Sequence, residues 1–378
     1  MPILGSQNAQ DFSSSEEQRL DVPLIISMLL IMAVGLTNVY SATSSGESGE
    51  SAVSLVLRQL AYFGVGTLVV AALLLFDYRI IERITYLLYG LNLAFLAAVP
   101  FIGSMRYGAR RWIDLKFISY QPSETMKIIT VLALAKYFYQ KSTTFSLDFK
   151  DLIIPGLILG VPAVMTIAQP DLGTGGHLAI AGTTILLFVG IRPRVLATAA
   201  LLAVVSFPIA WQYGLKPYQK DRIKTFIDPK QDPKGQGYNA LQSMIAVGSG
   251  QVLGKGFTKG TQTQLDFTPE GHTDFIFTVL AEEWGLAGCL FLFGLYLYLF
   301  SRCIRIASSA RDKFGSLVCV GVIGMLASQI FINVAMVTGM FPIVGLPLPL
   351  TSYGGTSVIT VCLSLGLLLN VGYRRTIF

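Results

Sequence analysis

Long apolar runs separated by short polar stretches dominate the hydropathy pattern of the chain. A helix needs about 20 mostly apolar residues to cross the hydrocarbon of a bilayer. About ten runs approach or exceed this length, so the pattern predicts an all-α fold, a polytopic membrane bundle of about ten transmembrane helices. The predicted helices lie near residues 22–42, 55–76, 81–103, 121–138, 151–168, 172–190, 193–212, 274–300, 314–339 and 351–373.

Composition supports a membrane class, because 53% of the residues are hydrophobic and only 13% are charged. Such a balance excludes an ordinary soluble enzyme of this length. The Ser-, Gln- and Glu-rich residues 1–20 predict a disordered cytoplasmic tail, and residues 21–378 a single membrane domain. The first apolar run is too long for a signal-peptide core, so we expect a retained anchor. The four cysteines have no metal-type spacing and are expected to be apolar fillers.

The distribution of Lys and Arg predicts which side of the membrane each loop occupies. Short cytoplasmic loops are enriched in these residues, and the short loops here place both termini in the cytoplasm. Residues 213–273 then form a large extracytoplasmic loop. This loop is basic, but loops of about 60 residues translocate largely regardless of charge.

Two outer segments are unexpectedly basic, the short loop at 106–116 and the long loop at 213–273. One interpretation is contact with lipid headgroups. The other is capture of an anionic, lipid-borne ligand such as a pyrophosphate, because Arg makes two-point contacts with phosphate. On the second interpretation Arg110, Arg111 and Lys116 of the short loop are candidate ligand-binding residues.

The stretch PEGHTDFIFTVLAEE combines His272, Asp274 and Glu282 at the start of an apolar run. Asp274 suits the first turn of a helix, where the helix dipole favours a carboxylate. In a continuous helix Glu282 would lie about 12 Å deeper in the membrane, at 1.5 Å per residue. An acid at that depth is by default a functional hypothesis.

Two further polar motifs stand at helix starts. In QPSETMK, Glu124 and Lys127 are three residues apart on one helix face and are predicted to form a structural ion pair. In QPDLGTGGH, Asp171 lies in an outer turn, where it is either a turn former or part of a site. Residues 235–250 of the long loop predict an amphipathic helix. The glycine-rich stretch after it lacks the order of a nucleotide-binding loop.

Six stretches together resemble the SEDS family of bacterial cell-wall proteins, in the family's order along the chain. The stretch GKGFTKGTQ favours the elongation branch of that family over the division branch. Small departures are Thr125 after QPSE and Thr268 before PE, and neither removes an ionisable group. The six stretches are GARRWIDL, QPSETMK, QPDLGT, GKGFTKGTQ, PEGHTDFIF and PLPLTSYGGTS.

The resemblance implies a peptidoglycan glycosyltransferase that polymerises lipid II on the outer face of the cytoplasmic (inner) membrane, for cell elongation and shape. Lipid II is a disaccharide-pentapeptide carried on undecaprenyl pyrophosphate. Asp274 matches the family's catalytic Asp. Positions tied in the family to activity or to the integrity of the cavity are matched by Arg110, Arg111, Glu124, Lys127 and Asp171.

We expect Asp274 to act as general base, while basic side chains or a divalent cation such as Mg or Mn stabilise the pyrophosphate. The sequence leaves the ligands of such a cation unassigned. The resemblance also implies a class B penicillin-binding protein as transpeptidase partner, together with the elongation machinery and membrane lipids but no nucleic acid. The candidate substrate-binding residues are Arg58, Arg110, Arg111, Lys116, Asp171, Arg222, Lys255 and His272.

Two other functions remain open from the sequence. A lipid II flippase or other transporter would use ionisable residues at several depths, as Glu124, Lys127 and Glu282 allow. Against it, the charges gather at the outer face, without matching pairs of interrupted helices. A non-catalytic scaffold would make no glycan chains from lipid II alone.

Overall fold

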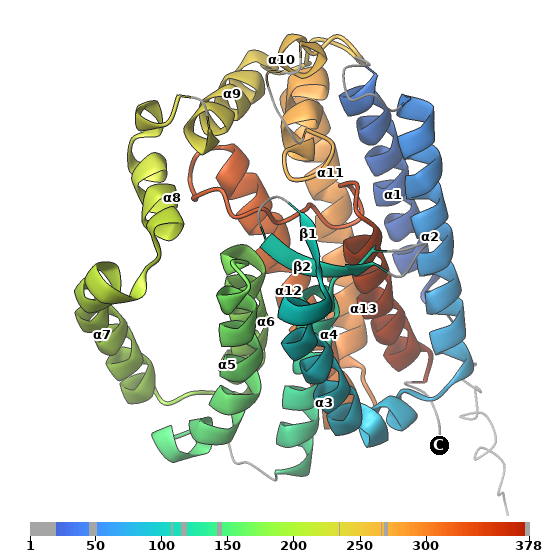
Figure 1. The fold of residues 1–378 in the computed structure, drawn as a ribbon. Coiled ribbons are helices and arrows are strands. Elements are labelled where there is room, and N and C mark those ends of the chain that lie inside the picture. Colours follow the sequence, from blue (N-terminus) through green and yellow to red (C-terminus); the bar gives the residue numbers. More distant parts are fainter. Residues whose placement is uncertain are drawn as a thin grey trace, which may run out of the picture.

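Helices form nearly all of the molecule, as the hydropathy pattern predicts (Figure 1). The computed structural model describes residues 20–44, 51–106, 109–114, 119–141, 146–233, 235–265, 267 and 271–374. Each predicted helix has a counterpart in it. These are α1 (Val22–Thr43), α2 (Ala52–Leu75), α3 (Tyr78–Ile102), α4 (Pro122–Gln140), α5 (Ile153–Ala168), α6 (Leu172–Val189), α7 (Pro193–Ile209), α11 (Ile276–Ser308), α12 (Lys313–Val337) and α13 (Gly355–Tyr373).

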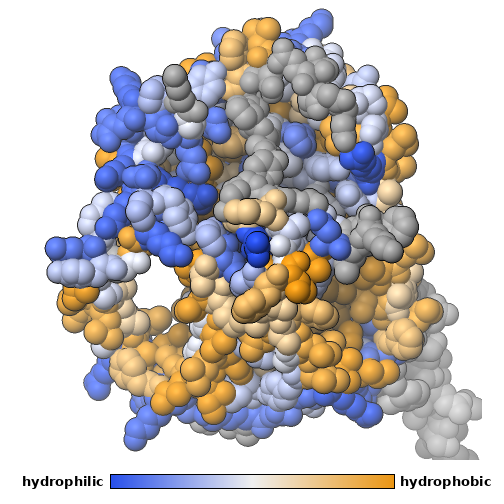
Figure 2. Space-filling model, in the orientation of Figure 1, coloured by the Kyte–Doolittle hydropathy of each residue, from blue (hydrophilic) through white to orange (hydrophobic). Residues whose placement is uncertain are grey.

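Eight of the described helices are long and apolar enough to cross a membrane, so the chain is a multi-pass membrane protein. The two other predicted spans fail this criterion for different reasons. Helix α4 carries Glu124, Lys127 and Lys136, all buried inside the bundle. Helix α7 has only 17 residues and stands apart from the other helices (Figure 1). Figure 2 shows a hydrophobic band between more hydrophilic ends of the molecule.

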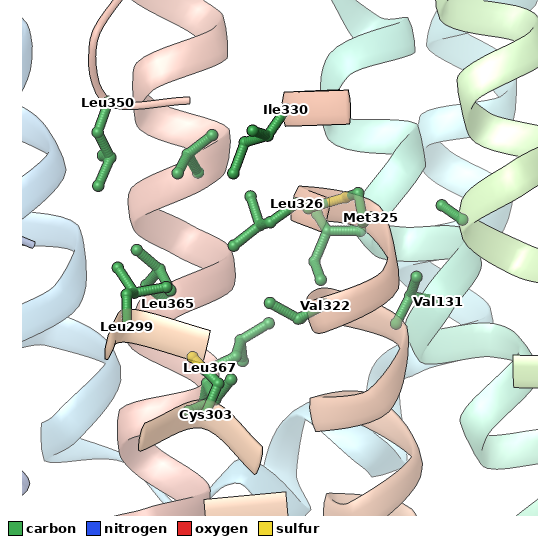
Figure 3. Close-up of a cluster of buried hydrophobic side chains, with 14 of the residues drawn as sticks. Val131, Leu299, Cys303, Val322, Met325, Leu326, Ile330, Leu350, Leu365 and Leu367 are labelled. Carbon is green, nitrogen blue, oxygen red and sulfur yellow. The ribbon is translucent and has the colours of Figure 1, made fainter. Parts of the chain in front are cut away.

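The centre of the bundle is packed by α12 against α4, α6 and α13 (Figure 3). Leu326, Met325 and Leu365 are almost completely buried there. Lipid tails are as apolar as these side chains, so close van der Waals packing holds membrane helices together. Gly321 allows this packing, because a Cβ at that position would come 2.4 Å from Val131 of α4.

One end of the bundle, here named the loop face, carries the segments of the predicted long loop (Figure 1). The predicted amphipathic helix is α9, and it packs on α11 and α12 with Gly237, Ser243 and Ala246 buried. A small antiparallel sheet of order β1-β2-β3 follows α3. The loop-face segments are α8 (Pro217–Ile227), η3 (Pro229–Gln231), α9 (Gln236–Ser249) and α10 (Thr261–Gln264). The strands are β1 (Ser104–Arg106), β2 (Ala109–Asp114) and β3 (Ser119–Tyr120), and two further short helices are η1 (Phe149–Leu152) and the π-helix η2 (Ala210–Gly214).

Helix α11 is not continuous, because the chain reverses at Gly285, whose φ of 62° and ψ of −159° are not helical. The aromatic rings of Phe277 and Phe293 lie only 5.6 Å apart. A straight helix would separate these two residues by about 24 Å, at a rise of 1.5 Å per residue. Residues 276–284, here named the half helix, therefore run antiparallel to residues 286–308.

The reversal corrects the predicted depths of the two acids. The Glu282 carboxylate contacts residues 255–263 of the loop face. Asp274, at the other end of the half helix, accepts a hydrogen bond through its main-chain oxygen from Asn333 of α12, at 2.8 Å. The prediction that Glu282 lies deeper than Asp274 is therefore wrong, because it assumed one continuous helix from 274 to 300.

Glu124 and Lys127 form the predicted ion pair on α4, with 2.9 Å between Nζ and Oε1 and both side chains buried. Removing one partner strands a buried charge, at a cost of about 3–5 kcal/mol. We expect Glu124→Ala and Lys127→Ala each to lower the melting temperature in detergent more than the double replacement does. The measurement is a double-mutant cycle on thermal stability. Additive effects would contradict a coupled pair.

Candidate active site

A cavity of about 1010 Å³ is lined by residues of α2, β2, α4, α6 and α8 and by the segments around Asp274 and Gly355. The cavity brings together side chains from distant parts of the chain. Their spacing in the sequence alone could not show that they lie close together. Seven of the residues singled out in the sequence line it. They are Arg58, Arg111, Glu124, Asp171, Arg222, His272 and Asp274.

Asp274 lies in the cavity wall just before the half helix, where the helix dipole favours a negative charge. Its side chain is partly exposed. Gly345 forms the opposing surface, since a Cβ there would come 3.2 Å from Asp274 Oδ2. Gly345 also has φ of +74°, a backbone conformation that glycine adopts without strain. The carboxylate is thus held against the main chain and faces the cavity.

Arg111 is fixed in the cavity wall by the turn that precedes α6. Its guanidinium donates to the carbonyl oxygen of Pro170 and lies 3.8 Å from Asp171 Oδ1. Asp171 also caps α6 by accepting from the Thr174 amide, and it accepts from Gln121 Nε2 at 3.1 Å. Asp171 is buried, so its role in this geometry is to hold Arg111 and Gln121 rather than to reach far into the cavity.

Arg110 and Arg111 have different surroundings although they are neighbours in β2. Successive side chains of a strand point to opposite faces. Arg110 is exposed, and its guanidinium donates to the Pro100 carbonyl oxygen at 3.0 Å. It does not line the cavity. The geometry therefore does not support the prediction that Arg110 binds substrate together with Arg111.

Two further cations enter the cavity from separate helices. Arg58 comes from α2 and Arg222 from α8 of the loop face. Burial, and then repulsion from the Arg111 guanidinium, lower the pKa of the Arg222 guanidinium from its ordinary value. Asp171 and Asp274 act in the opposite direction and raise this pKa, so Arg222 interacts electrostatically with these two cavity acids as well as with Arg111.

The two predicted lysines are not found in the cavity wall. Lys255 Nζ lies 2.7 Å from Glu282 Oε1 and 2.8 Å from the Thr261 hydroxyl, away from the cavity. The geometry thus gives Lys255 a structural contact in place of the predicted substrate contact. Lys116 lies outside the described residues.

Aromatic residues that the sequence reasoning missed form part of the wall around His272. The rings of His272 and Tyr353 lie 5.8 Å apart, and those of Tyr62 and Tyr353 lie 6.1 Å apart. The main-chain oxygen of His272 accepts from the Tyr353 amide at 2.9 Å. The stretch PLPLTSYGGTS contains Tyr353 and could have signalled it, whereas no local pattern pointed to Tyr62.

The arrangement combines four acidic side chains, Asp114, Glu124, Asp171 and Asp274, with three guanidinium groups. A carboxylate can accept a proton, and guanidinium groups can stabilise an anion. Among the described residues, no three His, Cys, Asp or Glu side chains gather as metal ligands. A divalent cation at the site stays a prediction.

Comparisons with known proteins find related chains and similar folds. A family model described as "Cell cycle protein" and named for FtsW, RodA and SpoVE matches residues 22–377. The peptidoglycan glycosyltransferase MrdB of Escherichia coli K12 is 37% identical over 92% of this chain and 93% of its own.

Two solved structures are similar over 94% of this chain. One belongs to a peptidoglycan synthase complex described as coordinating polymerization and crosslinking, with a TM-score of 0.80, 32% identity and 98% of that chain covered. The other is the rod shape determining protein RodA of Thermus thermophilus, with a TM-score of 0.70, 28% identity and 97% of that chain covered.

Proposed function

Since this chain belongs to the SEDS family of bacterial cell-wall proteins, we infer that it is a peptidoglycan glycosyltransferase of the rod-shape branch. The observation that carries the inference is the cavity, which holds Asp274 beside Arg58, Arg111 and Arg222. A carboxylate beside a basic surface suits a hydroxyl acceptor and a pyrophosphate-linked donor. The proposed substrate is lipid II.

The proposed reaction is a single displacement at the sugar carbon that carries the pyrophosphate. The 4-hydroxyl oxygen of the acceptor GlcNAc forms a bond to C1 of the donor MurNAc. The bond from C1 to the phosphate oxygen breaks, and undecaprenyl pyrophosphate leaves with its electron pair. Asp274 accepts the proton of the hydroxyl as general base. One catalytic carboxylate, rather than a nucleophile and acid pair, agrees with inversion at C1 by analogy with one-step glycosidases.

The leaving pyrophosphate needs its charge stabilised more than it needs a proton. Arg111 and Arg222 repel each other in the cavity wall, and a pyrophosphate between them would relieve this repulsion. The contacts of Arg111 with Pro170 and Asp171 fix its position before the substrate arrives. Such preorganised charge costs no rearrangement during the reaction.

The loop face is proposed to be extracytoplasmic, with both termini in the cytoplasm, as the Lys and Arg distribution indicates. The cavity would then meet lipid II at the outer surface of the cytoplasmic membrane. A class B penicillin-binding protein is the proposed partner that crosslinks the glycan strands. The similar chain from a peptidoglycan synthase complex supports this proposal.

A transporter is less well supported by the geometry than by the sequence. The transport hypothesis uses ionisable residues at several depths, Glu124, Lys127 and Glu282, and it takes Glu282 to lie about 12 Å deeper than Asp274. Its carboxylate instead lies at the loop face and is bound to Lys255 and Thr263. Four acids line the cavity: Asp114, Glu124, Asp171 and Asp274. We assign proton transfer to Asp274 because it lies where the half helix begins and matches the family's catalytic Asp, whereas Glu124 is paired with Lys127.

We predict that Asp274→Asn abolishes lipid II polymerisation by the purified protein with its partner. Loss of a general base typically costs about 10²- to 10⁴-fold in rate. Asp148→Asn is the matched control, because Asp148 is about half exposed, pairs with Arg192 and does not line the cavity. Gel analysis of the glycan products is the measurement. Polymerisation by the Asp274→Asn protein at the parent rate would show that Asp274 is not the base.

The two neighbouring arginines provide a second prediction. Arg111→Lys should lower the initial rate about 10-fold or more, because one charge-assisted hydrogen bond of about 1.5–3 kcal/mol is lost. Arg110→Lys should leave the rate unchanged, because Arg110 lies outside the cavity. Initial rates across lipid II concentrations check this, with melting temperature as the folding control. Equal effects at the two positions would contradict the assignment of Arg111 alone to the site.

A further inference from the structure

The Glu282 carboxylate joins two segments that are separate in sequence, the half helix and residues 255–263 of the loop face. It accepts five hydrogen bonds and is completely buried. Oε1 accepts from Lys255 Nζ at 2.7 Å, from the Gln262 amide at 2.9 Å and from the Thr261 hydroxyl at 3.3 Å. Oε2 accepts from the Thr263 hydroxyl at 2.9 Å and from its amide at 3.2 Å.

The main chain joins the same two segments. The Lys255 and Gly256 amides donate to the carbonyl oxygens of Glu282 and Glu283, at 3.0 and 2.9 Å. The Leu286 amide beyond the reversal donates to the Gln251 carbonyl oxygen at 2.9 Å. Gly254 permits this approach, because a Cβ there would come 2.1 Å from the Glu283 oxygen. These contacts fix the loop-face end of the half helix.

The other end of the half helix leads directly to Asp274. Every residue from Ile276 to Glu283 is buried, so this short helix is tightly enclosed. A packed helix moves as a unit, since its backbone hydrogen bonds hold its residues at fixed spacing. A displacement of the half helix at Glu282 therefore also displaces Asp274 and changes the position of its carboxylate in the cavity.

We propose that Glu282 is a positioning residue for Asp274, acting through the half helix that it fastens to residues 255–263. The proposal rests on the function inferred above, because it concerns the position of the Asp274 carboxylate as general base. It also gives Lys255 a different role from substrate binding. Lys255 neutralises and orients the Glu282 carboxylate from outside the cavity.

Glu282→Gln is the direct test, because the amide has the same shape but only one oxygen for the five donors. A displacement of about 1 Å in a catalytic group can cost 10²-fold in rate. We expect kcat for lipid II polymerisation to fall roughly 10- to 100-fold, with KM nearly unchanged. Lys255→Met should show the same pattern more weakly, whereas a substrate contact at Lys255 would raise KM.

Asn370→Leu is the matched control for a general loss of stability. Asn370 is also completely buried and donates to the Leu73 and Phe76 carbonyl oxygens at the opposite end of the bundle. It should lower the melting temperature without lowering kcat. A parental kcat for Glu282→Gln overturns the proposal. A loss of kcat that follows melting temperature equally in both variants overturns it as well.

Two further measurements keep the proposal testable under other outcomes. If Glu282→Gln does not fold, Thr263→Val removes a single hydroxyl donor and should still lower kcat at constant KM. Hydrogen exchange of residues 276–284 needs no substrate, so it tests directly whether Glu282 holds the half helix to residues 255–263. If the parent protein fails to polymerise lipid II, that failure refutes the proposed function, and the exchange measurement still tests the role of Glu282. Faster exchange in Glu282→Gln is expected, and unchanged exchange overturns the proposal.

Discussion

The reversal of the chain at Gly285 is the constraint on which the candidate site depends. Its φ of 62° suits glycine, and a Cβ there would come 2.4 Å from the Gly254 nitrogen. Because the chain turns back at this point, the half helix returns into the bundle and its first residues reach α12. Asp274 consequently stands in a cavity wall beside Gly345, not at an exposed helix tip.

The cost of charge inside a membrane bundle explains the rest of the arrangement. An ionised side chain in hydrocarbon is expensive, so such residues pair with each other or face a water-filled cavity. Glu124 pairs with Lys127, Asp171 lies beside Arg111, and Glu282 pairs with Lys255. The cavity keeps Asp274 beside the arginines, and this juxtaposition is what a pyrophosphate-linked substrate requires.

Hydropathy located the helices because every membrane span needs a long apolar run, and the polar motifs indicated most of the cavity. The reversal at Gly285 escaped prediction because apolar residues continue on both sides, and a glycine inside a helix costs only about 1 kcal/mol. The sequence could not show which of Arg110 and Arg111 points into the cavity, because the face to which each side chain points depends on how the strand pairs. Glu282 has its role only once a distant loop has folded onto it.

The central claim is that Asp274 faces a water-filled cavity that opens at the outer surface of the membrane. Asp274→Cys, in a variant without native cysteines, tests it with a membrane-impermeant thiol reagent added outside intact cells. Labelling of position 274, without labelling of a Thr278→Cys variant buried one turn further along the half helix, is the predicted result. Labelling of position 274 only after the membrane is permeabilised, or not at all, would contradict the account.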